Sequence, residues 1–433
     1  MVKLNILTSS VLLLAGFTSA LPTLEDLLGG SDAQLAPLFH APDAEIINDS
    51  YIVVLKDHVD TNAAQSHCHS VGSFAKRGES LIEYLDTGAM EGIKLTYDTP
   101  GLRGYAGKFS LETLHHIRSS PEVAFVEKDS MMYASEMQRN APWGLSRISH
   151  RTELTLRTFN KYEHDENGGE GVKVFVIDTG INVDHRDFHG RASWGATFAK
   201  DGDNDGNGHG SHCAGTIAGQ RFGVAKQANP VAVKVLSAQG SGSNSEVLAG
   251  INWAVEQHQI DAADAKKNGR KYKGAVANMS LGGGKSQALD RAVNNAVDEG
   301  LIFSVAAGND NRDACKYSPA AAANAITVGA TNLRDERAYF SNYGECVDVF
   351  APGQDIMSIW NTSPYSTNTI SGTSMAAPHV AGLAAYFLSL DERENVTPKM
   401  IKDKIIELGT RNKLKNIPND GTPNLLVFND FSA

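Results

Sequence analysis

The chain has 433 residues, of which 41% are hydrophobic and 21% are charged, and its 39 basic and 50 acidic residues give a net charge of −11. This length predicts about three domains and a large buried core, and the ordinary charged fraction argues against disorder. The acidic balance argues against a general nucleic-acid binder, which shows a basic excess. With only four cysteines, the chain is not a disulfide-rich scaffold. Composition therefore favours a large soluble globular protein, most simply an enzyme.

Residues 1–20 have the pattern of a signal peptide. Lys3 precedes an apolar stretch at 6–17, and the small residues Thr-Ser-Ala close the segment. An apolar stretch this short fits a signal peptide better than a membrane span, which needs about 20 residues. We therefore expect entry into the secretory pathway, no membrane anchor, and an oxidising lumen in which disulfides can form.

A small domain is expected next. Residues 21–49 are of mixed character and predict a poorly ordered leader. The following segments then predict, in order, a strand, a helix, two strands, a helix and a strand: 51–55, 63–85, two strands within 93–110, 111–118 and 123–126. The order β-α-β-β-α-β is that of a ferredoxin-like α+β domain, here at about 50–133. Residues 134–142 predict a polar linker.

From residue 143 onward, short apolar strands alternate with helical patterns. The strands are expected at 172–177, 231–235, 275–281, 301–306 and 325–328, and the helices near 245–258, 286–298, 375–388 and 398–408. Strands that are apolar on both faces require a parallel sheet covered by helices on both sides. The expected fold class of this region of nearly 300 residues is α/β.

Three separated motifs carry side chains that can act together. In Val-Ile-Asp-Thr-Gly, Asp178 directly follows the strand 172–177. In Gly-His-Gly-Ser-His-Cys-Ala-Gly, His209 opens a helix of small residues, and in Gly-Thr-Ser-Met-Ala-Ala-Pro-His, Ser374 opens another. Each alone has an ordinary structural explanation, such as a turn, a core histidine or a helix cap. Together they supply a nucleophile, a base and an acid that orients the base, in one of the known chain orders.

These motifs resemble those of subtilisin-like serine proteases, within them the proteinase K and cerevisin branch of fungal enzymes. The segments 280–283, 306–309 and 341–344 match as well. The resemblance covers about residues 143–430, and the upstream unit resembles the inhibitory propeptide of the family. It implies a subtilisin-like three-layer domain with a mainly parallel sheet, preceded by the ferredoxin-like propeptide domain.

The resemblance implies a role for each catalytic residue. Ser374 would attack the scissile carbonyl, His209 would carry the proton, and Asp178 would hold the imidazolium. The Ser374 N–H and Asn309, just beyond the strand 301–306, would form the oxyanion hole. No cofactor is implied for the chemistry.

The resemblance also implies where substrate binds. An extended peptide would lie between two segments, with small residues walling the main pocket: Gly240, Gly242, Ser280, Leu281, Gly282 and Gly283 for the segments, and Ala306, Ala307 and Gly308 for the pocket. Backbone pairing would supply affinity. The expected activity is endopeptidase action of broad specificity on proteins and peptides.

Other features follow from the same resemblance. Asp348, with backbone carbonyls near Ala323 and Ala325, matches a calcium position, although an ordinary exposed acid is an equal alternative. A disulfide is expected between Cys315 and Cys346. Cys213 is expected to stay a free, partly buried thiol.

Sequons predict glycans at Asn395, the best acceptor, and at Asn361.

The domain organisation implied is a signal peptide at 1–20, a propeptide at 21–135 and a peptidase domain at 136–433. We expect the propeptide to act as an intramolecular inhibitor whose tail, 133–136, enters the substrate cleft, with self-cleavage near Ser135–Glu136. The mature enzyme is expected to be a monomer in the vacuolar lumen or secreted.

Two alternatives remain open. Asp-Thr-Gly is also the signature of aspartic peptidases and occurs at Asp86 and Asp178. That chemistry needs both carboxylates on equivalent strand-turn loops, whereas Asp86 ends a helical pattern. The second alternative is a catalytically silent relative that serves as a binding protein.

Overall fold

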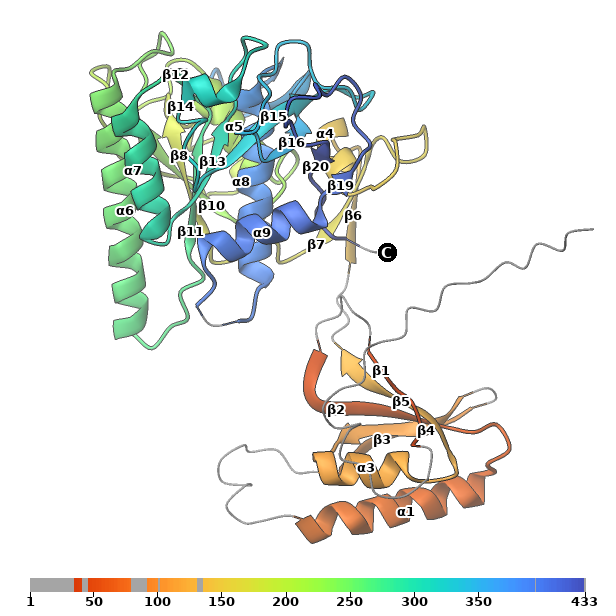
Figure 1. The fold of residues 1–433 in the computed structure, drawn as a ribbon. Helices are drawn as coiled ribbons and strands as arrows, with labels where there is room; N and C mark the ends of the chain where they lie inside the picture. The colour runs from red at the N-terminus through yellow and green to blue at the C-terminus, as the bar shows by residue number, and fades with distance from the viewer. Residues whose placement is uncertain are drawn as a thin grey trace, which may run out of the picture. The chain divides into compact units, whose positions relative to one another are not determined.

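A computed structural model describes residues 35–40, 46–78, 92–99, 102–130, 135–393 and 395–431. The predicted signal peptide and Asp86 therefore lie outside the described residues. The chain divides into two compact units, Met1–Met132 and Tyr133–Ala433, drawn in Figure 1. In the described part of the chain, no helix has the length and apolar character needed to cross a membrane.

In its described residues, the small unit is a five-stranded sheet with two helices. Its elements are β1 (Leu38–Phe39), β2 (Ile46–Leu55), α1 (Thr61–Gly78), β3 (Gly92–Thr99), β4 (Leu102–Lys108), α3 (Leu111–Arg118) and β5 (Val123–Ser130). The strand order β1-β5-β2-β4-β3 contains the ferredoxin-like arrangement, so that prediction is confirmed. Burial alternates along the second half of β2, as expected for a sheet with one packed face. The predicted poorly ordered leader is wrong for Leu38–Phe39, which pairs with β5.

The large unit is built on a nine-stranded sheet of order β19-β20-β16-β15-β13-β11-β8-β10-β9. The strands are β8 (Lys173–Asp178), β9 (Ser193–Thr197), β10 (Asn229–Lys234), β11 (Ala275–Met279), β13 (Ile302–Ala306), β15 (Ile326–Thr331), β16 (Val349–Pro352), β19 (Thr410–Arg411) and β20 (Leu425–Leu426). All neighbours are parallel except β19 and β20. The five predicted strands are present, and β11, β13 and β15 are buried along their whole length.

Helices cover both faces of this sheet, and the predicted three-layer fold is confirmed (Figure 1). The main helices are α5 (His209–Ala218), α6 (Asn244–Lys267), α7 (Gln287–Asp298), α8 (Thr373–Leu390) and α9 (Pro398–Leu408). Helices α6 and α7 pack on one face, over a core cluster that includes Phe175 and Val293. Helices α5 and α8 pack on the other, where α8 is buried on nearly all sides and α9 lies against it.

Local signals explain the helix starts. Ser243 forms a capping box with Glu246 at the start of α6, Ser286 caps α7, and Thr397 caps α9, which begins with Pro398. Side-chain oxygens at these positions satisfy backbone N–H groups that have no partner inside the helix. Shorter elements complete the unit: α4 (Trp143–Ile148), η2 (Arg186–Phe188), η3 (Ala314–Lys316), β12 (Gly283–Gly284) with β14 (Tyr317–Ser318), and β17 (Ile356–Ile359) with β18 (Thr367–Ile370).

Residues 135–139 differ from expectation. Instead of a polar linker they form β6 (Ser135–Arg139), antiparallel to β7 (Lys161–Asp165). The Asp165 N–H donates to the Tyr386 hydroxyl near the end of α8, whereas Ser374 stands at its beginning. Those 12 positions span about 18 Å of helix. In the folded chain Ser135 and Glu136 therefore lie away from Ser374, which differs from the expected placement of the tail in the substrate cleft; residues 133–134 of the tail lie outside the described residues.

Candidate active site

Asp178 and His209 meet at the carboxyl-end edge of the sheet. Strand β8 ends at Asp178, which is fully buried, and α5 begins at His209. His209 Nδ1 lies 2.8 Å from Asp178 Oδ1, which also accepts a hydrogen bond from the Thr179 N–H at 2.7 Å. Because Nδ1 faces the carboxylate, the other ring nitrogen of His209 is left for a nucleophile or a substrate.

Asp205 holds these two segments together. Its carboxylate accepts hydrogen bonds from the Thr179 hydroxyl at 2.9 Å and the Ser211 hydroxyl at 2.6 Å. The Thr179 hydroxyl in turn accepts from the Gly210 N–H. Since Thr179 follows Asp178 and Gly210 follows His209, the network fixes the segments that carry Asp178 and His209 relative to each other. Asp205 is not among the residues predicted from sequence, although an acid just ahead of a helix start is a recognisable signal.

The electrostatics of His209 suit a general base. Burial lowers the pKa of the imidazole, but the charge and hydrogen bond of Asp178 raise it, as does the charge of Asp205, and the net pKa lies above the ordinary 6.5. The side chain keeps 25% of its surface exposed, so a substrate can reach it. The carboxylate thus stabilises the imidazolium that forms when the ring accepts a proton.

The carbonyl oxygen of Ser374 accepts hydrogen bonds from residues outside its own helix. Pro378, four residues on, has no N–H, so the Ser374 carbonyl oxygen lacks its usual intrahelical partner. The Ser280 hydroxyl donates to that oxygen at 2.8 Å and the Cys213 thiol at 3.4 Å. Ser374 Oγ donates to the Ser280 carbonyl oxygen at 3.1 Å. The hydroxyl must therefore give up this hydrogen bond before it can pass its proton to His209.

Asn309 and the Ser374 N–H border one small space. Asn309 Oδ1 accepts hydrogen bonds from the Thr373 N–H at 2.8 Å and the Thr373 hydroxyl at 2.9 Å, which leaves the Nδ2 donor of this exposed residue free to face a substrate. A Cβ atom placed on Gly372 would lie 3.6 Å from both Asn309 Nδ2 and Ser374 N, and 3.7 Å from Asn309 Oδ1. The two nitrogen atoms therefore lie near one point, and a pair of N–H donors is what a developing oxyanion requires.

Cys213 lies directly behind Asp178 and His209. It is fully buried and free, and burial raises the pKa of its thiol. One donor atom each of Asp178, His209 and Cys213 lie within 4.8 Å of one another.

A cleft of about 400 Å³ runs beside His209. It is lined by all the residues predicted for the two substrate-binding segments: Gly240, Gly242, Ser280, Leu281, Gly282 and Gly283. The residues predicted for the main pocket do not line this cleft. Ala306 and Ala307 are buried at the end of β13, and Gly308 is half-buried next to Asn309, so their role stays a prediction.

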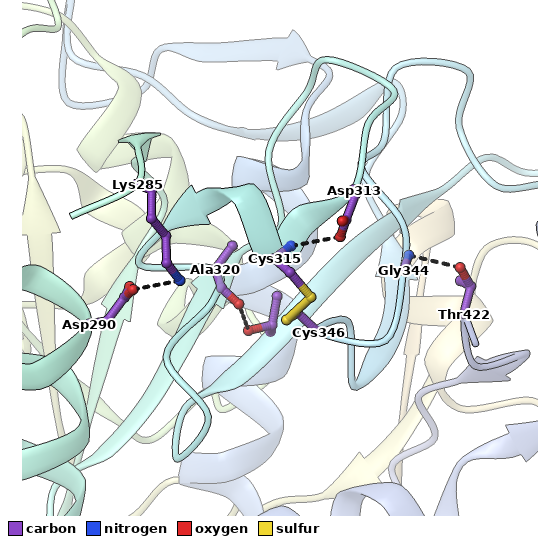
Figure 2. The surroundings of a disulfide bond; sticks show 9 residues. Lys285, Asp290, Asp313, Cys315, Ala320, Gly344, Cys346 and Thr422 are labelled. Atoms are coloured by element: carbon purple, nitrogen blue, oxygen red, sulfur yellow. Dashed lines mark hydrogen bonds and ion pairs between the residues drawn. A yellow bond between two sulfur atoms is a disulfide. The ribbon is translucent and has the colours of Figure 1, made fainter. Parts of the chain in front are cut away.

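The predicted disulfide between Cys315 and Cys346 is present in the structure, with its Cα atoms 5.3 Å apart (Figure 2). Around it, the Cys315 N–H donates to Asp313 Oδ1, and the Gly344 N–H donates to the Thr422 hydroxyl. The bridge therefore ties the short helix η3 to the loop that precedes β16.

The predicted calcium position at Asp348 does not fit a metal ion. The side chain of Lys402 reaches into it, and its ammonium group contacts the Asp348 carboxylate and the carbonyl oxygens of Ala323 and Ala325. A cation supplied by the chain already takes the ligands that calcium would use, and the calcium prediction is corrected accordingly.

The structure also corrects one predicted glycan. Asn361 Nδ2, the atom that would carry the sugar, donates to the Asp205 carbonyl oxygen at 2.9 Å, and its Oδ1 is buried. This amide faces inward, so we no longer expect modification there. Asn395 is exposed just before α9, and its glycan stays a prediction.

Comparison with known proteins identifies the family. Residues 169–420 match the Subtilase family, and residues 50–135 match Peptidase inhibitor I9. The subtilisin-like serine protease Pen c 2 of Penicillium citrinum is 53% identical over 416 residues, which cover 91% of this chain and 90% of the relative. This chain belongs to the subtilase family.

Further relatives agree. Alkaline protease 2 of Aspergillus fumigatus is 52% identical over 415 residues, covering 91% of this subtilase and 83% of the relative. The crystal structure of a cold-adapted subtilisin-like serine proteinase has 44% sequence identity and a TM-score of 0.60, and the match covers 68% of this chain and 100% of that one. The protein is thus a serine endopeptidase that carries an inhibitor-type propeptide ahead of its peptidase domain.

Proposed function

We propose that this subtilase cleaves peptide bonds with Ser374 as nucleophile, His209 as general base and Asp178 as the carboxylate that orients the base. The 2.8 Å contact between His209 Nδ1 and Asp178 Oδ1 carries the proposal. Ser374 Oγ contacts Ser280, and Ser280 lines the same cleft as His209. His209 thus lines the cleft, Ser374 contacts a residue that lines it, and Asp178 is buried behind His209, which supports a role for the three in hydroxyl nucleophilic catalysis.

The reaction follows from these contacts. As Ser374 Oγ bonds the scissile carbonyl carbon, its proton passes to His209 Nε2 and the carbonyl oxygen takes up a negative charge. Asn309 Nδ2 and the Ser374 N–H donate to this oxyanion, with the positive end of α8 behind them. When the C–N bond breaks, the imidazolium returns the proton to the leaving amine. Water then releases the acyl group by the same proton transfers.

The cleft supports broad specificity. Substrate would lie extended along the backbone of 240–242 and 280–283, where main-chain hydrogen bonds recognise any sequence. The cleft lining includes the apolar residues Leu236, Leu281 and Leu289 and no acidic side chain. We therefore propose action on many proteins, with apolar side chains favoured and no requirement for a basic one.

We further propose that the enzyme matures by cleaving itself. Residues 1–20 would direct the chain into the secretory pathway, 21–135 would form the inhibitory propeptide, and 136–433 would remain as a monomeric peptidase, vacuolar or secreted. Because β6 pairs with β7 in the folded chain, cleavage near Ser135–Glu136 would have to precede that pairing.

A labelling experiment tests the proposal. A fluorophosphonate should label the enzyme at Ser374, and both labelling and hydrolysis of casein should be lost in Ser374→Ala. The same variant should keep its propeptide attached. A wild-type chain that folds but takes no label would favour the silent relative, and normal propeptide removal in Ser374→Ala would assign processing to another protease.

A further inference from the structure

The ammonium group of Lys402 is surrounded by four oxygen atoms at the amino-end edge of the sheet. Its Nζ lies 2.6 Å from the Ala325 carbonyl oxygen and 3.1 Å from that of Ala323. The two carboxylate oxygens of Asp348 lie at 2.9 and 3.0 Å. The two carbonyl groups precede β15, Asp348 precedes β16, and Lys402 belongs to α9. One side chain therefore ties a helix to the beginnings of two neighbouring strands.

These oxygens are of the kind that bind calcium, but the Lys402 ammonium group already occupies the space between them. Calcium needs about six to eight oxygen ligands at about 2.3–2.6 Å, supplied by carboxylates, carbonyls and water. A metal ion among these four oxygens would overlap Nζ and meet its positive charge. The ammonium, by contrast, has three N–H donors for four acceptors, so it is fully satisfied where it lies.

The Asp348 carboxylate depends on this cation. The side chains of Lys402 and Asp348 are only 18% and 22% exposed. Asp348 Oδ2 also accepts the Thr327 N–H at 2.8 Å, which supplies a dipole but no charge. Burial raises the pKa of Asp348, and the Lys402 ammonium opposes that rise. Removing one partner of such an enclosed pair leaves the other charge poorly solvated.

We infer that Lys402 is a built-in structural cation: its ammonium does at Asp348 what a bound metal ion would do, and the native chain takes up no divalent cation there. The inference concerns stability and is independent of the proposed catalytic roles. It implies that chelators leave this corner of the fold intact, and that removing the side chain opens an oxygen-lined site for calcium.

The test compares thermal unfolding of the full chain, inactivated with a serine-directed inhibitor, in chelator and in millimolar calcium or magnesium. Lys402→Ala should lower the Tm by roughly 5–10 °C in chelator, and calcium, but not magnesium, should restore at least half of the loss. The recovery should vanish in the double variant Lys402→Ala, Asp348→Asn. Lys399→Ala is the matched control, because Lys399 lies on the same helix and pairs with Asp403 at the surface; it should change the Tm little.

Three results would overturn the inference. The first is a calcium-induced rise in the Tm of the native chain that Asp348→Asn removes. The second is an equal loss of stability in Lys402→Ala and Lys399→Ala. The third is that calcium does not restore the Tm of Lys402→Ala, or that it restores the Tm equally in the double variant that also carries Asp348→Asn. If Lys402→Ala folds too poorly for unfolding measurements, its refolding yield in calcium against magnesium supplies the same comparison.

Discussion

The two ends of the parallel strands carry similar pairs of charges with opposite properties. At the carboxyl ends, Asp178 faces His209; at the amino ends, Asp348 faces Lys402. The imidazole can release its proton near neutral pH, whereas an ammonium cannot. His209 also keeps one ring nitrogen for chemistry, whereas all three N–H groups of Lys402 have acceptors within the fold. Similar pairs of charges thus leave a titratable ring with one nitrogen unbonded to its partner at one edge, and an ammonium with acceptors for all its N–H groups at the other.

If this contrast is correct, substitutions at the carboxyl-end edge lower activity with little effect on the Tm. Substitutions at Lys402 and Asp348 lower the Tm with little effect on activity. Asp178→Asn should give the largest effect, lowering kcat/KM by about 10⁴ because the amide favours the wrong tautomer of His209. Hydrolysis of a chromogenic peptide and calorimetry of the inhibited protein measure the two quantities.

The pH profile provides the control for Asp178→Asn. Because the pKa of His209 is raised and the base must be neutral, kcat/KM of the parent should fall on the acid side at a pH above 6.5. The residual activity of Asp178→Asn should fall at a lower pH. Coincident profiles would mean that Asp178 does not set the pKa of the base.

Asn309→Ala should lower kcat by about 10²–10³ with KM nearly unchanged, a magnitude known from a subtilisin and transferred here. Steady-state kinetics on one peptide measure both constants. Thr373→Val should lower kcat less than Asn309→Ala does, since the variant loses the hydroxyl bond to Asn309 Oδ1 but keeps the N–H bond. A rise in KM at constant kcat would show that Asn309 binds the ground state instead.

Two buried histidines should weaken the fold in acid. Burial lowers the pKa of His212 to about 3 and that of His379 to about 4, from an ordinary 6.5. Below pH 6.5 the unfolded chain therefore binds protons that the folded chain does not. The free energy of unfolding is unaffected above this pH and falls below it, by up to ~1.4 kcal/mol per pH unit and histidine.

His379→Leu should reduce the slope of the unfolding free energy against pH by the amount that corresponds to about one proton taken up on unfolding. Urea unfolding of the inhibited protein at several pH values between neutral and mildly acidic measures the slope. An unchanged slope would mean that His379 takes up its proton within the folded protein.

Of these substitutions, Cys213→Ser is expected to change the activity least. A mercurial should inactivate the parent slowly, because the thiol is buried and its modification would crowd His209. Cys213→Ser should keep most of its activity and resist the reagent. Equal sensitivity of the two proteins would place the reactive group elsewhere.

Sequence patterns predicted the elements that carry their own signals. The strand 172–177 is apolar on both faces, and α9 begins at Pro398 after the capping Thr397, so both were predictable. The short strands at Leu38–Phe39 and Ser135–Arg139 were not, because their hydrogen bonds go to partners elsewhere in the chain. A strand of two to five residues has little periodicity of its own.

The candidate catalytic residues could be predicted from the order of amino acids alone, since Asp178, His209 and Ser374 each stand in a long motif at a strand end or a helix start. The contacts of Lys402, by contrast, become visible only in the folded chain. On α9 alone it resembles any solvated lysine, and its partner Asp348 is 54 positions away. Local chemistry can be read from neighbouring residues, but an ion pair between elements exists only after packing has removed water from both charges and brought them together.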